Sequence, residues 1–186
     1  MTAADADPNA CTGCTGRCCR DVVVAVTGYD AWRIATERDV AFADFLTVAS
    51  AGAGEPGAFR LGDGFGVLVL ARDPSGDDAC VFLSAAVDGV RMCGTHPSRP
   101  NVCRVYPMAL RDGAIVLRAD VVCCDRDWNM AAIDRPAWHA EIARYASDWA
   151  TYERVVAAWN ANGGVDADAF MGYVRSVYDS GFAFRL

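Results

Sequence analysis

The chain has 186 residues, of which 53% are hydrophobic, and a formal net charge of −7. Its length allows one domain with a sizeable core, its apolar content argues against disorder, and its acidic charge argues against a nucleic-acid partner. No apolar run approaches the roughly 20 residues that span a bilayer. The first ten residues, MTAADADPNA, are polar and acidic where a secretory signal would be basic and then apolar. We therefore expect a cytoplasmic protein without a membrane segment.

The first elements are expected after a cysteine-rich loop. Residues 21–26 are a β-branched run, which predicts a short buried strand. Thr27 and Asp30 have the spacing of a capping box, so a helix should begin after Thr27. This helix should carry three apolar side chains inward: Trp32, Ile34 and Ala35. A second short helix is expected within residues 40–50.

The sequence pattern in the middle of the chain is typical of a small β structure. Residues 51–57, AGAGEPG, predict a surface loop. From residue 59 to 117, short β-prone runs alternate with Asp-Gly and Pro-Ser-Gly-Asp turns, which predicts a small antiparallel sheet or hairpins. The glycines of LGDGFGV (61–67) precede a strand, whereas those of a dinucleotide loop follow one, so we interpret them as a hairpin turn.

The last third of the chain has a helical period. Asp134 is the expected N-cap of a long helix that the sequence NANGG (160–164) should end. Steps of three and four residues place seven large side chains on one stripe: Trp138, Ile142, Tyr145, Trp149, Tyr152, Val156 and Trp159. We interpret this stripe as part of the core. A final helix should begin at Asp166 and carry Phe170, Val174 and Val177.

Nine cysteines dominate the chemistry of the sequence. The first group, in CTGCTGRCC, comprises Cys11, Cys14, Cys18 and Cys19, and the second comprises Cys80, Cys93, Cys103, Cys123 and Cys124. The second group must fold back on the first to close one site. Because the cytosol keeps thiols reduced, metal binding is the leading explanation for all nine. This number is too large for a single four-coordinate site and is sufficient for two.

Both zinc and iron–sulfur clusters are held by thiolates. Only the first group contains a Cys-x-x-Cys turn, and the spacings of the later cysteines are irregular for a zinc ribbon. These two observations favour an iron–sulfur cluster of the [4Fe–4S] type. Zinc is the alternative. Residues 91–111 contain no acid and four arginines: Arg91, Arg99, Arg104 and Arg111. Such arginines would offset the negative charge of a thiolate centre. We predict that Arg99 and Arg104 contact the cofactor.

Three motifs occur in a recognisable order. They are Cys11-x2-Cys14-x3-Cys18-Cys19, Cys80-x-Phe82-Leu83, and Cys93-x5-Arg99-Pro100-x2-Cys103-Arg104-x-Tyr106-Pro107. Together they resemble the YkgJ family of cysteine-cluster proteins, the zinc- or iron-chelating CxxCxxCC domain, and the resemblance covers roughly residues 11–124. The cysteine-rich part of flagellin lysine N-methylase is distantly similar.

The sequence also departs from the family pattern. Three residues separate Cys14 from Cys18, where the family label implies two. His96 stands where relatives commonly have an aromatic residue, so we expect it to pack or to support the site rather than bind metal. Either Cys123 or Cys124 is the counterpart of the final cysteine of the family, and the other is a spare thiol.

These observations predict an α+β fold with a small cysteine-rich metal-binding core, short antiparallel strands and a helical C-terminal part. We place a metal-binding domain at residues 1–127 and a helical subdomain packed on it at residues 128–186. One function is an iron–sulfur protein acting in redox chemistry, or in modification of a peptide or small molecule, with a redox partner protein. The alternative is a zinc-stabilised module for protein–protein interaction. All 17 basic residues are arginine, which excludes lysine chemistry, and His139 is interpreted as structural.

Overall fold

The computed structural model describes residues 16–75, 77–84, 91–122 and 128–181. The described helices are α1 (Arg17–Asp21), α2 (Gly28–Arg38), α3 (Asn101–Val105), α4 (Arg135–Ala161) and α5 (Ala167–Asp179), with single 3₁₀ turns η1 (Phe42–Asp44) and η2 (His96–Ser98). The described strands are β1 (Leu46–Ala51), β2 (Phe59–Leu61), β3 (Gly64–Leu70), β4 (Met108–Arg111) and β5 (Ala114–Leu117). The predicted α+β class is confirmed.

Helix α2 begins as its capping signal predicts. The Thr27 hydroxyl accepts a hydrogen bond from the Asp30 amide at 3.1 Å, and this satisfies one of the donors that a helix N-terminus leaves open. Ile34 and Ala35 are buried, and Trp32 is half-buried against the same core. The helix ends at Arg38, where Asp39 adopts a left-handed conformation.

The strand predicted at residues 21–26 is largely wrong. Its first residue ends α1, and only the bridge between Ala25 and Val69 pairs the remainder with β3. Two backbone hydrogen bonds of 3.0 Å flank that bridge, from the Val26 amide to the Leu68 carbonyl and from the Leu70 amide to the Val24 carbonyl. The β-branched run therefore lies beside the part of β3 that β2 does not cover, without forming a full strand.

The second helix expected within residues 40–50 is also wrong. The chain makes the single turn η1 and then enters β1, which pairs antiparallel with β3 from Leu46–Leu70 to Ala51–Phe65. Pairing with Phe65–Leu70 of β3 satisfies backbone groups of this segment, and the β-branched Thr47 and Val48 favour a strand. Strand β3 is the centre of the three-stranded sheet, whose order is β1-β3-β2.

The hairpin predictions are confirmed. Strands β2 and β3 pair from Phe59–Gly66 to Leu61–Gly64, so LGDGFGV is a hairpin turn as predicted. Strands β4 and β5 form a second antiparallel pair joined through Asp112 and Gly113.

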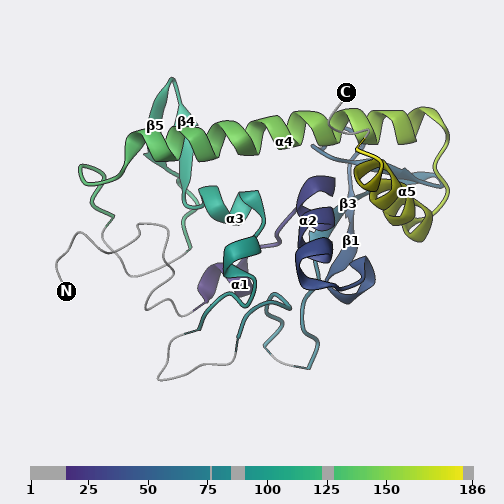
Figure 1. The fold of residues 1–186 in the computed structure, drawn as a ribbon, viewed down its shortest axis with the longest axis horizontal. Helices are drawn as coiled ribbons and strands as arrows, with labels where there is room; N and C mark the ends of the chain where they lie inside the picture. Colours follow the sequence, from purple (N-terminus) through teal and green to yellow (C-terminus); the bar gives the residue numbers. More distant parts are fainter. Residues whose placement is uncertain (1–15, 76, 85–90, 123–127, 182–186) are drawn as a thin grey trace.

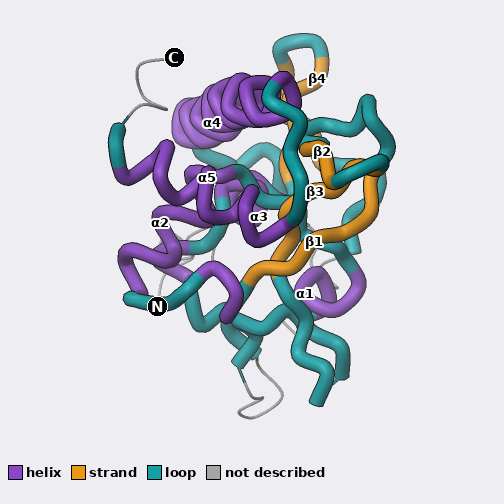
Figure 2. The backbone as a smooth tube through the Cα atoms, turned by 90° about the vertical axis from the view of Figure 1, so that its right-hand side faces the viewer, coloured by secondary structure: helices purple, strands orange, loops and turns teal. Residues whose placement is uncertain are grey.

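The two C-terminal helices begin at their predicted caps. The side chains of Asp134 and Asp166 accept hydrogen bonds from the third residues that follow them, at 3.0 Å and 2.7 Å. Helix α4 runs along the whole molecule, and α5 folds back beneath it next to α2 (Figure 1). Helices α2, α4 and α5 lie on one side of the three-stranded sheet (Figure 2).

One core joins these helices to the sheet. Phe170 of α5 stacks on Phe59 of β2 with ring centroids 3.6 Å apart and an interplanar angle of 11°, and both rings are fully buried. Tyr152 of α4 and Ile34 of α2 belong to the same cluster. A smaller cluster forms where Trp138, near the start of α4, packs on the β4–β5 hairpin. The predicted boundary between residues 127 and 128 stays a prediction. None of the described helices combines the length and apolar character that crossing a membrane requires.

Candidate metal centre

Five of the nine predicted ligands lie within the described residues, and they come from three segments. Cys18 and Cys19 lie in α1, Cys80 follows β3, Cys93 pairs with Leu83 ahead of η2, and Cys103 lies in α3. All five are free thiols of intermediate burial. Cys11, Cys14, Cys123 and Cys124 lie outside the described residues.

The backbone brings the two cysteine groups together, as a composite site requires. The Cys80 amide donates to the Cys19 carbonyl at 2.7 Å, which ties the second group directly to α1. Cys93 pairs with Leu83 in a short bridge, and the Gly94 amide beside it donates to the Phe82 carbonyl at 2.7 Å. Segments that are far apart in the sequence thus meet at the thiols.

Gly16 allows the first segment to approach closely. Its φ of 74° lies in the left-handed region, and a Cβ there would be 2.9 Å from Leu83 Cδ1. A loop that wraps tightly around a metal or cluster often needs such a positive φ, which glycine adopts without strain.

The two adjacent thiols point close to each other. Cys18 Sγ and Cys19 Sγ are 4.0 Å apart. Neighbouring side chains diverge in an extended backbone, but here both residues lie in a helical turn. The separation is close to the edge of a zinc–thiolate tetrahedron, which is about 3.8 Å for zinc–sulfur bonds of about 2.3 Å.

Burial and mutual proximity disfavour thiolates here when no cation is present. The pKa of Cys103 is raised well above its ordinary value, first by burial and then by the neighbouring Cys93, Cys80 and Cys18. The pKa of Cys19 is raised first by its hydrogen bond with Cys18 and then by burial. Burial also raises the pKa of Cys80.

These thiols fit a metal or cluster. Neighbouring cysteine sulfurs contribute to the raised pKa of Cys19, Cys80 and Cys103, so these thiols lie near enough to interact. A cation among them would offset the repulsion between their thiolates. Cysteine thiolate is the donor that zinc and iron–sulfur clusters prefer. Among the described residues alone, no three His, Cys, Asp or Glu side chains already converge in metal-binding geometry.

A comparison with protein families agrees with this chemistry. The family model CxxCxxCC, described as a "putative zinc- or iron-chelating domain", matches residues 10–124. The chain belongs to the CxxCxxCC family. All nine cysteines fall within the matched range, and the resemblance of the three motifs is confirmed. Searches of curated proteins and of solved structures found no match.

The arginines predicted to contact the cofactor of this CxxCxxCC domain bind protein groups. Arg99 is 8% exposed, and its guanidinium lies 3.0 Å from His96 Nε2. Arg104 donates to the Pro97 carbonyl at 3.0 Å and pairs with Glu141 at 3.8 Å. His96 therefore supports Arg99, and contact of either arginine with a cofactor stays a prediction.

Arg72, whose charge reaches a thiol, was not predicted from the sequence. Arg72 forms a bridge with Cys80 through the backbone, and its charge lowers the pKa of that thiol against the effect of burial. The guanidinium is fixed by the Arg20 carbonyl at 2.6 Å and the Val22 carbonyl at 3.0 Å. Arg72 lies outside the arginine-rich stretch, and its only sequence signal is its place across a turn from Cys80.

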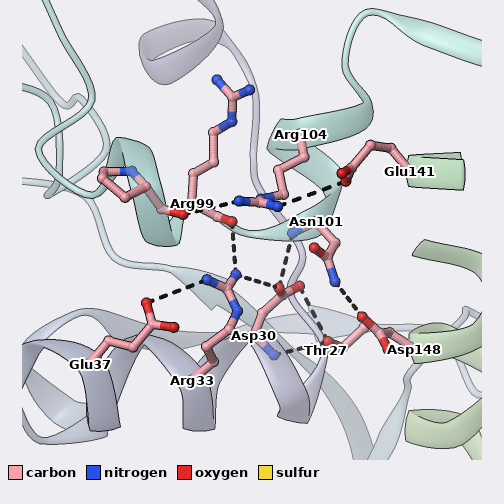
Figure 3. A network of polar contacts seen from close by, with 10 residues as sticks. Thr27, Asp30, Arg33, Glu37, Arg99, Asn101, Arg104, Glu141 and Asp148 are labelled. Atoms are coloured by element: carbon pink, nitrogen blue, oxygen red, sulfur yellow. Dashed lines mark hydrogen bonds and ion pairs between the residues drawn. The ribbon is translucent and has the colours of Figure 1, made fainter. Parts of the chain in front are cut away.

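A buried polar network joins the start of α2 to α3, the helix that carries Cys103 (Figure 3). Asp30, which is 1% exposed, accepts hydrogen bonds from the Thr27 hydroxyl at 3.2 Å, from Arg33 at 3.3 Å and from the Asn101 amide at 2.9 Å. Burial raises its pKa, while the Asn101 amide and Arg33 lower it. Asp30 was predictable as part of a cap, but its contact with α3 was not. The shorter aspartate in place of the usual glutamate was the available signal.

Proposed function

We propose that the chain holds a thiolate-ligated iron–sulfur centre between α1, the Cys80 segment and α3. It would act in redox chemistry, or in modification of a peptide or small molecule, together with a redox partner protein. The observation that carries this proposal is the 2.7 Å hydrogen bond from the Cys80 amide to the Cys19 carbonyl, because it brings both cysteine groups to one place. The nine thiols of the chain exceed the needs of one four-coordinate ion.

The residues of the chain have distinct roles in this proposal. Cys18, Cys19, Cys80 and Cys103, with Cys93 beside them, would supply thiolates. Arg72 favours ionisation of Cys80. The half-buried setting limits access of water and oxidants to the sulfurs. When bound, an iron–sulfur cluster supplies one-electron transfer.

A second candidate is a structural zinc module for protein–protein interaction. The 4.0 Å separation of Cys18 Sγ and Cys19 Sγ favours it, because two thiolates on one ion lie at about this distance. Zinc closed by four thiolates has no open coordination position, so its contribution is to fold and stabilise the three segments.

Anaerobic purification with iron, zinc and acid-labile sulfide analysis distinguishes these functions. The iron–sulfur centre predicts iron with matching sulfide and a brown, oxygen-sensitive protein. A colourless protein with zinc and no iron overturns the iron–sulfur centre and supports the zinc module. The variant Cys80→Ser should lose metal, whereas a serine at the exposed Val165, remote in sequence from every thiol, should not. A wild-type protein free of both metals would overturn both candidates.

A further inference from the structure

Helix α2 contacts the backbone of the segment between Cys93 and Cys103 at three points. Arg38 donates to the Gly94 carbonyl at 2.8 Å, one residue after Cys93. Arg33 donates to the Arg99 carbonyl at 2.8 Å. Asp30 accepts from the Asn101 amide at 2.9 Å, two residues before Cys103. One helix without cysteines therefore holds both ends of a thiol-bearing segment.

The contact at Asp30 replaces a cap that α3 lacks. The residue at the N-cap position, Pro100, makes no side-chain capping hydrogen bond, and α3 itself is only five residues long. Because so short a helix has little stability of its own, the orientation of α3 depends on its contacts with other elements. The carboxylate of Asp30 satisfies the first amide of the helix and lies where negative charge is favoured.

Helix α4 contacts α3 from another side. The Asn101 side chain donates to Asp148, and Arg104 pairs with Glu141 at 3.8 Å (Figure 3). Both α3 residues flank Cys103, and α4 lies beyond the range that the family model matches. These contacts hold the side chains of α3, whereas Asp30 holds its backbone.

Burial of Asp30 suggests a role beyond capping its own helix. Thr27 already caps α2, yet Asp30 is an almost fully buried carboxylate. A buried charge is costly unless hydrogen bonds satisfy it. Only one of its three partners lies outside α2 and its cap, and this partner is the α3 amide.

We propose that α2 is the positioning element of the metal centre, and that Asp30 orients the Cys103 thiol by fixing the first turn of α3. The inference rests on the proposed thiolate centre, because the positioning acts on a bound metal. Residues that orient metal ligands typically change metal affinity about 10–100-fold when they are removed.

Cobalt(II) titration of the reduced, metal-free full chain tests this role, with thiolate-to-cobalt absorption as the readout. Asp30→Ala should bind cobalt about 10–100-fold more weakly and show altered d–d bands, because Cys103 is no longer held in place. Asp30→Asn should stay within a few-fold of wild type, since its carboxamide oxygen can accept the same amide proton. Phe59→Leu is the matched control: it removes buried ring volume in β2, where Phe59 stacks on Phe170 of α5, and should bind cobalt as wild type does.

The outcomes separate the two proposals. Wild-type protein that binds no cobalt overturns the thiolate centre itself. Wild-type affinity and an unchanged spectrum in Asp30→Ala, even with a lower melting temperature, overturn only the positioning role. If Asp30→Ala does not fold by circular dichroism, the exposed Arg38→Met carries the test. The Arg38→Met variant loses the hydrogen bond to the Gly94 carbonyl beside Cys93. A cobalt affinity equal to that of wild type would overturn the role of α2, and a several-fold loss of cobalt affinity would support it.

Discussion

Metal affinity should depend steeply on pH, because the metal-free thiols are protonated. Burial and neighbouring sulfurs raise the pKa of Cys19, Cys80 and Cys103. All three therefore carry protons at neutral pH, and each must lose its proton to become a thiolate ligand. Raising the pH lowers the cost of that loss, so affinity should rise with pH.

The magnitude follows from the number of protons released. Below the pKa of all three thiols, the apparent association constant is inversely proportional to the cube of the proton concentration. Between pH 6.5 and 7.5, affinity should therefore rise by about a thousandfold, equivalent to about 4 kcal/mol. Further thiolate ligands with ordinary pKa values would make the dependence steeper.

Competition with a chelator of known proton affinity, in degassed buffers across this pH range, measures the slope. Calorimetry in buffers of different ionisation enthalpy counts the released protons independently. Binding that changes less than tenfold per pH unit would refute the reasoning, because at most one protonated thiol would then bind the metal.

Two substitutions test the packing that supports the site. Phe170→Ala removes a fully buried ring that stacks on Phe59, so it should lower the free energy of unfolding by about 3–5 kcal/mol in urea titrations. A loss below about 1 kcal/mol would contradict this packing. Gly28→Ala would place a Cβ 2.6 Å from Tyr178 Cε2 and 2.9 Å from Val174 Cγ1, so it should cost about 1–3 kcal/mol despite the better helix propensity of alanine; thermal melting that shows added stability would contradict it.

The helices with complete end signals were predictable from the sequence. Asp134 and Asp166 act as caps where a regular apolar period begins, and local hydrogen bonding decides both starts. Residues 40–50 lack such signals, and pairing with β3, a contact remote in sequence, decided their structure. For the same reason residues 21–26 remained only partly paired.

The candidate site was predictable in its thiols but not in its supporting contacts. Cysteine spacing identifies residues with ligand chemistry whatever the intervening fold. The contact of Asp30 with α3, and that of Arg72 with the α1 backbone, join segments whose approach no local pattern encodes. The density of arginines near Cys93 and Cys103 predicted cofactor contacts for Arg99 and Arg104. Their observed contacts are with His96, Pro97 and Glu141.

The most direct test of a composite centre is the metal content of single and double cysteine variants purified anaerobically. Cys19→Ser and Cys103→Ser remove one thiol from each group. If both thiols bind the same metal, each substitution should cause a large loss and the double variant should lose little more than either single variant. Independent losses that add in the double variant, or full metal content in all three, would contradict a centre shared between α1 and α3.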